Sequence, residues 1–382
     1  MNILILSAAT GGGHIEASKA LKNGIEEKYP ESRVEVIDGL KYISSFLDIV
    51  ISKSYLILAK YLKCSYKNLY KLTDKNSFIS FIVEKLTLKF SSKLIPLIKE
   101  VNADVIITTH PFLTGMISAL KKTGKINVLS ICTMTDYECH CSWLHSNIDI
   151  YSVAWNGMIP EMVAHGIKKE IIHDFGIPVN PKFFHTTKND GIELKRELGL
   201  TENKTTILVM AGSFGVNNII EVYQEISEIP LDFQVVILTG NNKALYRKIE
   251  KKVQSSNKET RIIKFTKEVY RYMAMADVLI TKPGGLTVSE ALASNLPLIV
   301  FDSIPGQEEG NAKFLIDNGM AISIGKGKKC KNEVEKLLKD KAKIEEMAKM
   351  CQEFDKSGAI DNLVDIMSDY KEDEAAIEMT LK

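Results

Sequence analysis

The first residues that could do chemistry form a turn of three glycines that ends in a histidine. Residues 10–14 read Thr-Gly-Gly-Gly-His and follow the apolar run 2–6, ahead of a helical pattern over residues 15–28. Glycines let the backbone approach a ligand closely, and a helix N-terminus offers unpaired N–H groups and a partial positive charge. We therefore expect an acceptor or phosphate loop at Gly11, Gly12 and Gly13. The spacing does not match the dinucleotide motif G-x-G-x-x-G.

His14 is the candidate general base beside this turn. An imidazole has a pKa near working pH, as a general base requires. In doubly wound sheets, ligands collect at the carboxyl ends of the strands, where this turn should lie. The alternative is a histidine that caps the helix or serves only the structure.

A second glycine turn opens the other half of the chain. Residues 211–215 read Ala-Gly-Ser-Phe-Gly and follow the apolar run 206–210. Backbone N–H groups in such a turn can contact a diphosphate. The candidate donor-binding residues here are Gly212, Ser213 and Phe214.

The most informative motif is residues 281–291, Thr-Lys-Pro-Gly-Gly-Leu-Thr-Val-Ser-Glu-Ala. A strand over residues 278–280 should end there, and a Pro-Gly-Gly turn should present N–H groups to a phosphate. Thr287 is expected to cap the following helix. Glu290 lies about one turn further on, where it could accept both hydroxyls of a ribose; its alternative is the capping box Thr287-x-x-Glu290. The donor-binding candidates are Gly284, Gly285, Leu286, Thr287 and Glu290.

Residues 305–312, Pro-Gly-Gln-Glu-Glu-Gly-Asn-Ala, follow another strand pattern. Gln307 can donate and accept hydrogen bonds and Glu308 accepts strongly, so both suit sugar hydroxyls. A solvent-exposed polar loop is the alternative.

The elements that must position these residues alternate between short apolar runs and helical patterns. Runs at 2–6, 34–38, 105–109 and 128–131 predict one parallel sheet, and runs at 206–211, 235–239, 278–280 and 298–301 predict a second. Residues 176–181 contain one glycine and two prolines, which suits a hinge. We predict an α/β protein of two doubly wound domains, 1–183 and 184–365, with a polar tail over 366–382.

Composition restricts the possible ligands and the cellular compartment of this protein. The net charge of +1 gives no indication of nucleic-acid binding, and 6 scattered cysteines favour a reducing compartment. No signal peptide is visible, and no apolar run approaches the ~20 residues of a membrane span. Any membrane contact should therefore be peripheral.

One segment differs from the rest of the chain in its charge. Residues 40–99 contain 11 lysines, no arginine and 3 acids, a net charge of +8 in a chain of net charge +1. At helical spacing, five of the lysines share one face, with tyrosines interleaved. This pattern suits an anionic membrane surface, and a solvated helix face is the alternative. The five are Lys53, Lys60, Lys63, Lys67 and Lys71.

Five motifs together resemble the diacylglycerol glycosyltransferases, which are processive glucosyltransferases of Gram-positive bacteria and monogalactosyldiacylglycerol synthases of plastids in glycosyltransferase family 28. They are the Gly-Gly-Gly-His turn, residues 134–136 (Met-Thr-Asp), residues 143–145 (Trp-Leu-His), and the motifs 281–291 and 305–312. The resemblance spans roughly residues 2–365. The peptidoglycan N-acetylglucosaminyltransferase has the same arrangement of motifs, with a more distant resemblance.

The resemblance implies a GT-B fold, with two Rossmann-like domains facing across a cleft, and inverting transfer from a UDP-sugar to diacylglycerol without an active-site metal or other cofactor. The lipid would bind the N-terminal domain and the donor the C-terminal domain, with the last helix, near residues 352–367, crossing back. It also implies a cytoplasmic protein, peripheral on the inner face of the cell membrane.

The resemblance also implies residue roles. His14 would be the base, and Asp136, at the family's acidic position, is a rival base. Glu290 would hold the ribose. Phe265 would lie near the uracil. Gln307 and Glu308 would face the donor sugar, and Asn311 belongs to the same donor-binding motif.

One stretch departs from the family pattern. Residues 139–141 read Cys-His-Cys, with His145 close by, and Cys141 does not obviously fit the family. These groups could build a zinc site, but adjacent residues are poorly placed for tetrahedral ligation, so we expect no metal.

Three other functions compete on the same fold. They are a UDP-sugar 2-epimerase, a UDP-GlcNAc-dependent lipid-intermediate glycosyltransferase of cell-wall synthesis, and a nucleotide-sugar binding protein without catalysis. The epimerase would leave the lysine-rich segment without a purpose. The binding protein would require that His14 and Asp136 be dispensable. No residue named here distinguishes glucose from galactose.

Overall fold

The computed structural model describes residues 1–9, 12–44, 87–210, 216–301, 307–325 and 330–380, and the chain forms two compact units. One unit comprises Met1–Val179 and the C-terminal stretch from Lys356. The other contains most of the chain between Asn180 and Asp355. Several candidate residues lie outside the described residues, namely Gly11, Gly212, Ser213, Phe214, Lys53, Lys60, Lys63, Lys67 and Lys71.

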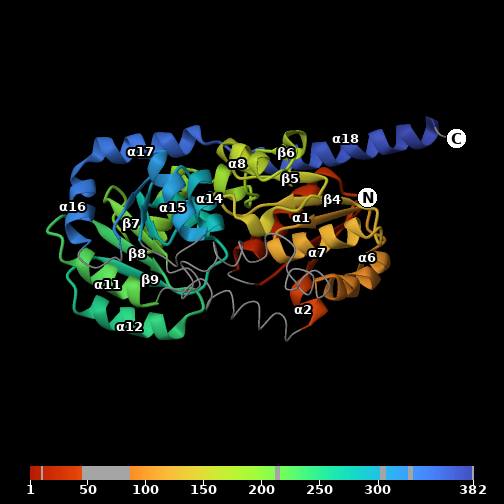
Figure 1. Ribbon diagram of the computed structural model, residues 1–382. Coiled ribbons are helices and arrows are strands. Elements are labelled where there is room, and N and C mark those ends of the chain that lie inside the picture. The colour runs from red at the N-terminus through yellow and green to blue at the C-terminus, as the bar shows by residue number, and fades with distance from the viewer. Residues whose placement is uncertain (10–11, 45–86, 211–215, 302–306, 326–329, 381–382) are drawn as a thin grey trace, which may run out of the picture. The chain divides into compact units, whose positions relative to one another are not determined.

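The first unit is built on a six-stranded parallel sheet in the order β2-β1-β3-β4-β5-β6 (Figure 1). Because β3 pairs with β1 on the side opposite β2, the strand order reverses beside β1, as in doubly wound folds. The strands are β1 (Asn2–Ser7), β2 (Arg33–Asp38), β3 (Val105–Thr108), β4 (Leu129–Thr133), β5 (Ile150–Ser152) and β6 (Ile172–His173).

Helices cover this sheet because its strands are apolar on both faces. In β1, Ile3 to Leu6 are all fully buried. The described helices are α1 (Gly13–Lys28), α2 (Gly39–Ile43), α6 (Ile95–Val101), α7 (Pro111–Lys122), α8 (Ile159–Ala164) and α18 (Ala359–Thr380), with short 3₁₀ turns η1 (Ser92–Leu94), η2 (Cys141–Trp143), η3 (Asn156–Met158) and η4 (Lys169–Ile171).

The last helix, α18, packs on the first unit beside α1 (Figure 1). Its Leu363 and Met367 enter the same core as Leu21 of α1. At the rim, Lys28 pairs with Asp365 at 2.6 Å. The residues expected to form a polar tail therefore include the end of a long helix that runs to Thr380.

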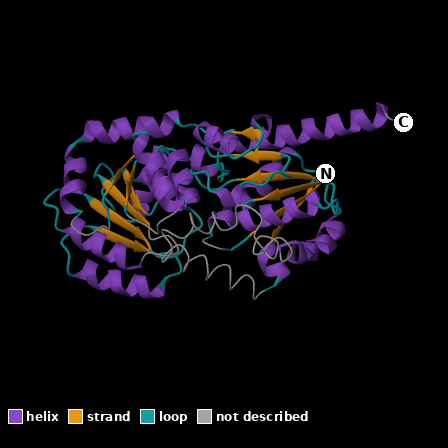
Figure 2. Ribbon diagram, in the orientation of Figure 1, coloured by secondary structure: helices purple, strands orange, loops and turns teal. Residues whose placement is uncertain are grey.

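The second unit repeats the architecture, with a parallel sheet in the order β12-β11-β10-β7-β8-β9 and helices flanking its strands (Figure 2). The strands are β7 (Thr206–Met210), β8 (Gln234–Leu238), β9 (Thr260–Ile263), β10 (Val278–Thr281), β11 (Leu298–Val300) and β12 (Ala321–Ser323). The helices are α9 (Lys182–His185), α10 (Lys188–Glu197), α11 (Val216–Ser227), α12 (Lys243–Gln254), α13 (Val269–Met275), α14 (Gly285–Ala293), α15 (Gln307–Asp317), α16 (Lys331–Lys339) and α17 (Lys341–Glu353).

All eight strands expected from apolar runs are present. In the part of the chain that the structure describes, the strands that the sequence pattern did not reveal are β5, β6, β9 and β12, each of two to four residues. Three of them are edge strands, and β5 lies next to one. Because these strands are so short, hydrophobic periodicity gives little signal for them. The chain passes from one unit to the other at Val179, within the stretch expected to be a hinge.

Candidate functional site

His14 stands at the head of α1, and the glycine turn before it determines this position. Gly12 is the N-cap of α1 and has a φ of 81°, a left-handed conformation that glycine adopts without strain. Gly13 is the first residue of the helix. The chain can therefore turn from β1 directly into α1 and present His14 in the first helical turn.

The first turn of α1 is fixed by buried hydroxyl groups. The backbone carbonyl of His14 accepts a hydrogen bond from Ser18 Oγ at 2.9 Å and lies 3.3 Å from Thr109 Oγ1. Thr109 Oγ1 also bonds Ser7 Oγ at 2.9 Å. Since Ser7 ends β1 and Thr109 follows β3, the carboxyl ends of two neighbouring strands hold His14 in place.

The His14 side chain contacts three residues from three different segments. Its Nδ1 lies 2.8 Å from Thr135 Oγ1, just beyond β4. Its ring meets the His110 ring edge to face, with centroids 4.8 Å apart. The ring of Trp143 lies 6.2 Å away. The sequence singled out His14 but not Thr135 or His110 as its neighbours.

Burial governs the protonation of His14. Removal of the ring from water lowers its pKa to about 4, and a backbone hydrogen bond with Thr109 acts in the opposite sense. A buried imidazole resists protonation because the charged form loses its hydration. His14 is therefore neutral at pH 7, which is the form that can accept a proton.

Asp136, the rival base, follows Thr135 directly and is 7% exposed. The structure thus brings the Met-Thr-Asp motif to His14, and the contact is made by Thr135.

The Cys-His-Cys stretch has a local structural role. His140 is the N-cap of η2, and its Nδ1 accepts from the Ser142 N–H at 3.2 Å. His145 Nε2 lies 3.2 Å from the Ser142 carbonyl. Burial raises the pKa of the Cys139 thiol to about 12, so this thiol is protonated at neutral pH. In the part of the chain that the structure describes, no cluster of three or more His, Cys, Asp or Glu side chains could hold a metal ion.

In the second unit, the Pro-Gly-Gly turn leads into α14, but Thr287 is not the cap. Gly284 is the N-cap and makes no side-chain cap hydrogen bond, and Thr287 is the third residue of the helix. The capping-box interpretation of Thr287 and Glu290 is therefore wrong, because the helix begins before Thr287 and the motif requires it to begin after. The first-turn N–H groups of Gly285, Leu286 and Thr287 have no acceptor within the helix.

Two side chains of α15 hold this turn. Lys282 forms a close ion pair with Glu308, and both side chains are mostly buried. Asn311, fully buried, donates from Nδ2 to the Pro283 carbonyl at 3.0 Å. Among the described residues, Glu308 Oε2 is buried without a hydrogen-bond partner. One carboxylate oxygen thus positions Lys282. Gln307 is the first residue of α15.

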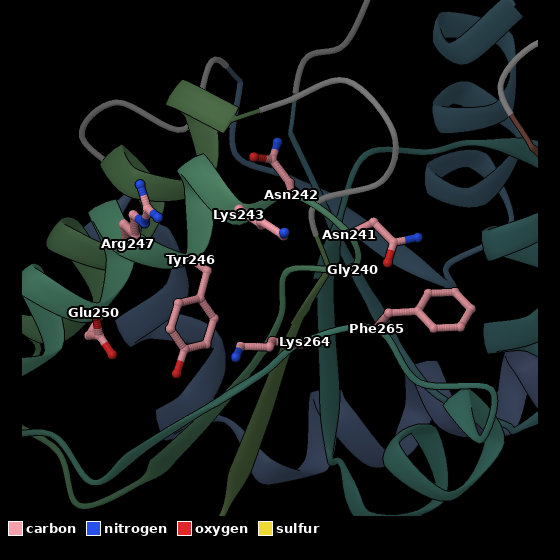
Figure 3. A pocket seen from close by; sticks show the side chains of 9 residues that line it. All are labelled: Gly240, Asn241, Asn242, Lys243, Tyr246, Arg247, Glu250, Lys264 and Phe265. Atoms are coloured by element: carbon pink, nitrogen blue, oxygen red, sulfur yellow. The ribbon is translucent and has the colours of Figure 1, made fainter.

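Phe265 lies beside a pocket of about 400 Å³ at the carboxyl ends of β8 and β9. Its side chain is 57% exposed, which is unusual for a large apolar group. Figure 3 shows Phe265 and Tyr246 on two sides of the pocket, with Lys264 between them. The Lys264 ammonium lies 4.9 Å from the Tyr246 ring centroid. An exposed aromatic face beside cationic groups suits a planar, anionic ligand.

Comparisons with known proteins identify the family of this chain. Residues 14–179 match the monogalactosyldiacylglycerol (MGDG) synthase family, and residues 206–363 match the glycosyltransferase family 28 C-terminal domain. A processive diacylglycerol beta-glucosyltransferase of Bacillus pumilus is 31% identical over 90% of this chain and 88% of its own. A protein of the same name from Bacillus cereus is 28% identical over 95% and 92%. This chain belongs to the diacylglycerol glycosyltransferase family.

Solved structures show that this diacylglycerol glycosyltransferase family member has the GT-B fold. Acinetobacter baumannii MurG matches with a TM-score of 0.62 and 13% identity, covering 97% of this chain and 100% of that one. A UDP-GlcNAc 2-epimerase from Neisseria meningitidis, bound to UDP-GlcNAc, matches with a TM-score of 0.61 and 15% identity over 97% and 100%. MurG and the epimerase have nearly equal TM-scores, so the fold alone does not distinguish their functions for this chain. The similarity in sequence to the Bacillus proteins does distinguish them.

Proposed function

We propose that this protein transfers a hexose from a UDP-sugar to the hydroxyl of diacylglycerol, with inversion, and so makes a membrane glycolipid. The observation that carries the proposal is the neutral His14, held by Thr135 at the head of α1. Family membership supports the substrates, because the two Bacillus relatives are named diacylglycerol glucosyltransferases. Those names favour glucose as the hexose and favour neither the epimerase nor the cell-wall enzyme.

The Thr135 contact allows a separate role for each nitrogen of His14. With the proton on Nδ1, donated to Thr135 Oγ1, the lone pair of Nε2 can accept a proton. The hydrogen bond also restrains the plane of the ring. Thr135 would thus orient the base, as the third group does in catalytic triads.

The transfer step exchanges one bond at the anomeric carbon for another. The diacylglycerol oxygen forms a bond to this carbon, and the bond from the carbon to the β-phosphate oxygen breaks. Its electron pair leaves with UDP, and the hydroxyl proton passes to Nε2 of His14. Burial disfavours the imidazolium, so we expect proton transfer to accompany bond formation rather than precede it.

The donor would be held by the second unit. The first-turn N–H groups of α14 suit the diphosphate, and Glu290 suits the ribose hydroxyls. The second carboxylate oxygen of Glu308 suits a sugar hydroxyl, and the exposed face of Phe265 suits the base. The donor set proposed from sequence also includes Gly212, Ser213, Phe214, Gln307 and Asn311.

The test is incorporation of label into lipid. The purified protein is incubated with diacylglycerol in mixed micelles and UDP-[¹⁴C]glucose, and in parallel with labelled UDP-galactose and UDP-GlcNAc. Label in the organic phase from a UDP-hexose supports the proposal, and product analysis gives the sugar and the number added. Label only from UDP-GlcNAc, or conversion of the UDP-sugar without transfer, would refute it. Transfer is expected to persist in EDTA, because the proposal includes no metal.

We also propose that the protein works as a peripheral protein on the inner face of the cell membrane. No helix among the described residues has the length and apolarity to cross a membrane. The acceptor is insoluble, so the enzyme must reach a lipid surface. The lysine-rich stretch 40–99, with its net charge of +8, suits anionic headgroups.

A further inference from the structure

His110 is a buried polar side chain that the fold does not account for. It is the N-cap of α7, yet its side chain makes no cap hydrogen bond. It is 3% exposed, and its Nδ1 has no hydrogen-bond partner among the described residues. A buried polar group without a partner costs free energy, so a residue of this kind is expected to serve something other than stability.

The contacts of the His110 ring are aromatic. The ring stacks on Phe112 at 5.7 Å and 26°, and it meets His14 at 4.8 Å and 73°. Phe112 is itself 42% exposed and follows Pro111 at the start of α7. The His110 ring therefore contacts both the exposed ring of Phe112 and the ring of His14.

Two independent contacts then restrain the His14 ring. The hydrogen bond to Thr135 holds one ring nitrogen and so restrains the plane of the ring. The edge-to-face contact with His110 opposes any shift of the ring from this position, because a displaced ring would clash with it or leave a void. Catalysis by a positioned base is sensitive to such errors, since a displacement of ~1 Å can cost ~10²-fold in rate.

We propose that His110 is a positioning residue for the diacylglycerol glycosyltransferase reaction, holding the His14 imidazole in its catalytic orientation and shielding part of it from water. The proposal rests on the proposed function for its kinetic test only. The role lies in the shape and apolar contact of the His110 ring, and not in a hydrogen bond from it.

The electrostatic surroundings agree with this role. Burial lowers the pKa of His110 well below its ordinary value, and the neighbouring His14 lowers it further. Other titratable groups lie within three residues of His14 or Thr135 in the sequence. Cys132 lies in β4 with a thiol pKa raised to about 12 by burial, Asp136 follows Thr135, and Glu16 on α1 pairs with Lys19 at 2.6 Å. If water enters where His110 stood, the His14 pKa should rise toward its ordinary 6.5.

The experiment compares His110→Ala, which empties the space, with His110→Phe, which keeps an aromatic ring without nitrogens. We expect His110→Ala to lower kcat by about 10²-fold with little change in KM for the donor, and His110→Phe to restore most of it. The low-pH limb of the kcat profile should move to higher pH in His110→Ala. Wild-type kcat and pH profile in His110→Ala would overturn the proposal, as would His110→Phe being as impaired as His110→Ala.

His173→Ala is the matched control. His173 stacks on Phe175 at 5.1 Å and 19°, with the same His-x-Phe spacing, but it lies in β6 at the edge of the sheet, away from β1 and α1. Its loss should leave kcat unchanged.

A second readout separates this inference from the proposed function. The His14 ring is titrated by NMR in ¹³C-histidine-labelled protein, without any substrate. The His14 pKa should rise in His110→Ala and stay low in His110→Phe and His173→Ala. That result would support the positioning role even if no lipid were glycosylated, and an unchanged His14 pKa in a folded His110→Ala variant would refute it.

Discussion

Among the single residues, the group that would do chemistry is distinct from the groups that hold it. His14 carries the basic nitrogen, and its neighbours orient the imidazole ring and reduce its contact with water. Thr135 contributes one hydrogen bond at 2.8 Å. Tyr151 holds the neighbouring loop, because its hydroxyl accepts from the His145 N–H at 2.8 Å. Burial keeps His14 unprotonated, which suits a base.

Loss of the base should be the most severe single change. We expect His14→Ala to lower turnover by ~10²–10⁴-fold, with UDP affinity little changed, because the proposed donor residues belong to the second unit. Steady-state kinetics and calorimetry measure the two effects. Near-wild-type turnover in His14→Ala would instead favour Asp136 as the base.

Thr135 offers a finer test of orientation. Thr135→Val keeps the shape of the side chain but removes the hydroxyl, so we expect kcat to fall by ~10-fold or more while KM for UDP-sugar changes little. Thr135→Ser retains the hydroxyl and should recover most of the activity. Equal activity in the valine and serine variants would show that the hydrogen bond to His14 does not matter.

Among the elements, α14 and α15 act together. The helix α14 begins at Gly285 without a side-chain cap, so its first N–H groups can bind a ligand. The first turns of α15 contribute Glu308 and Asn311, which hold Lys282 and the Pro283 carbonyl. The turn is thus supported by α15 while the helix N-terminus keeps its capacity to bind an anion.

Glu290 lies on this supported helix, and its loss should weaken donor binding. Charge-assisted hydrogen bonds contribute about 1.5–3 kcal/mol each, so we expect Glu290→Ala to reduce UDP affinity at least tenfold. Since Gly284 is the N-cap, the change removes no capping box. Glu309→Ala, at an exposed position of α15, serves as the control. Calorimetry giving unchanged UDP affinity in a folded Glu290→Ala variant would exclude the ribose role.

In the molecule as a whole, histidines with a lowered pKa are concentrated in the first unit. Burial lowers the pKa of five of the 7 histidines, and all five lie before Val179. Both tryptophans, Trp143 and Trp155, lie in the same unit. The five are His14, His110, His140, His145 and His173.

This distribution predicts acid sensitivity of the first unit. The folded pKa values lie below the unfolded value of 6.5, so as the pH falls the unfolded chain binds protons first. The stability is therefore complete above pH 6.5 and declines as the pH drops toward the folded values, about 4 for His14. For His14 this cost is up to about 1.4 kcal/mol per pH unit in this window.

Urea unfolding followed by tryptophan fluorescence measures this effect. Between pH 7.5 and pH 5.5 we expect the midpoint to fall clearly, and His110→Phe should show a weaker dependence because one such group is absent. An unchanged wild-type midpoint across that range would contradict the lowered pKa values of these histidines.

Membrane binding is the second whole-molecule prediction. We expect charge reversal of Lys60, Lys63, Lys67 and Lys71 to glutamate to abolish sedimentation with anionic vesicles and to leave UDP binding intact. High salt should weaken wild-type binding in part, because charges are screened over ~8 Å at physiological ionic strength. The matched control reverses four exposed lysines of the second unit, Lys336, Lys339, Lys341 and Lys349. If the first variant still pelleted as wild type does, another surface would have to reach the lipid.

Eight of the parallel strands, the glycine turn that leads into α1 and the family could be predicted from the sequence alone. The strands and the turn depend on short stretches of residues, because a buried strand needs a continuous apolar run and a close turn needs glycine. His14 could be singled out in the same way, because it follows such a turn directly.

The residues that surround His14 could be known only from the folded chain. Thr135 is 121 residues away in the chain, and His110 and Trp143 come from two further segments. The cap of α14 was also predicted wrongly, since it is Gly284 and not Thr287. Contacts between distant segments are set by how strands order within a sheet, and no local pattern records that order. A pKa lowered by burial, such as that of His14, depends on the same packing, so it too arises only on folding.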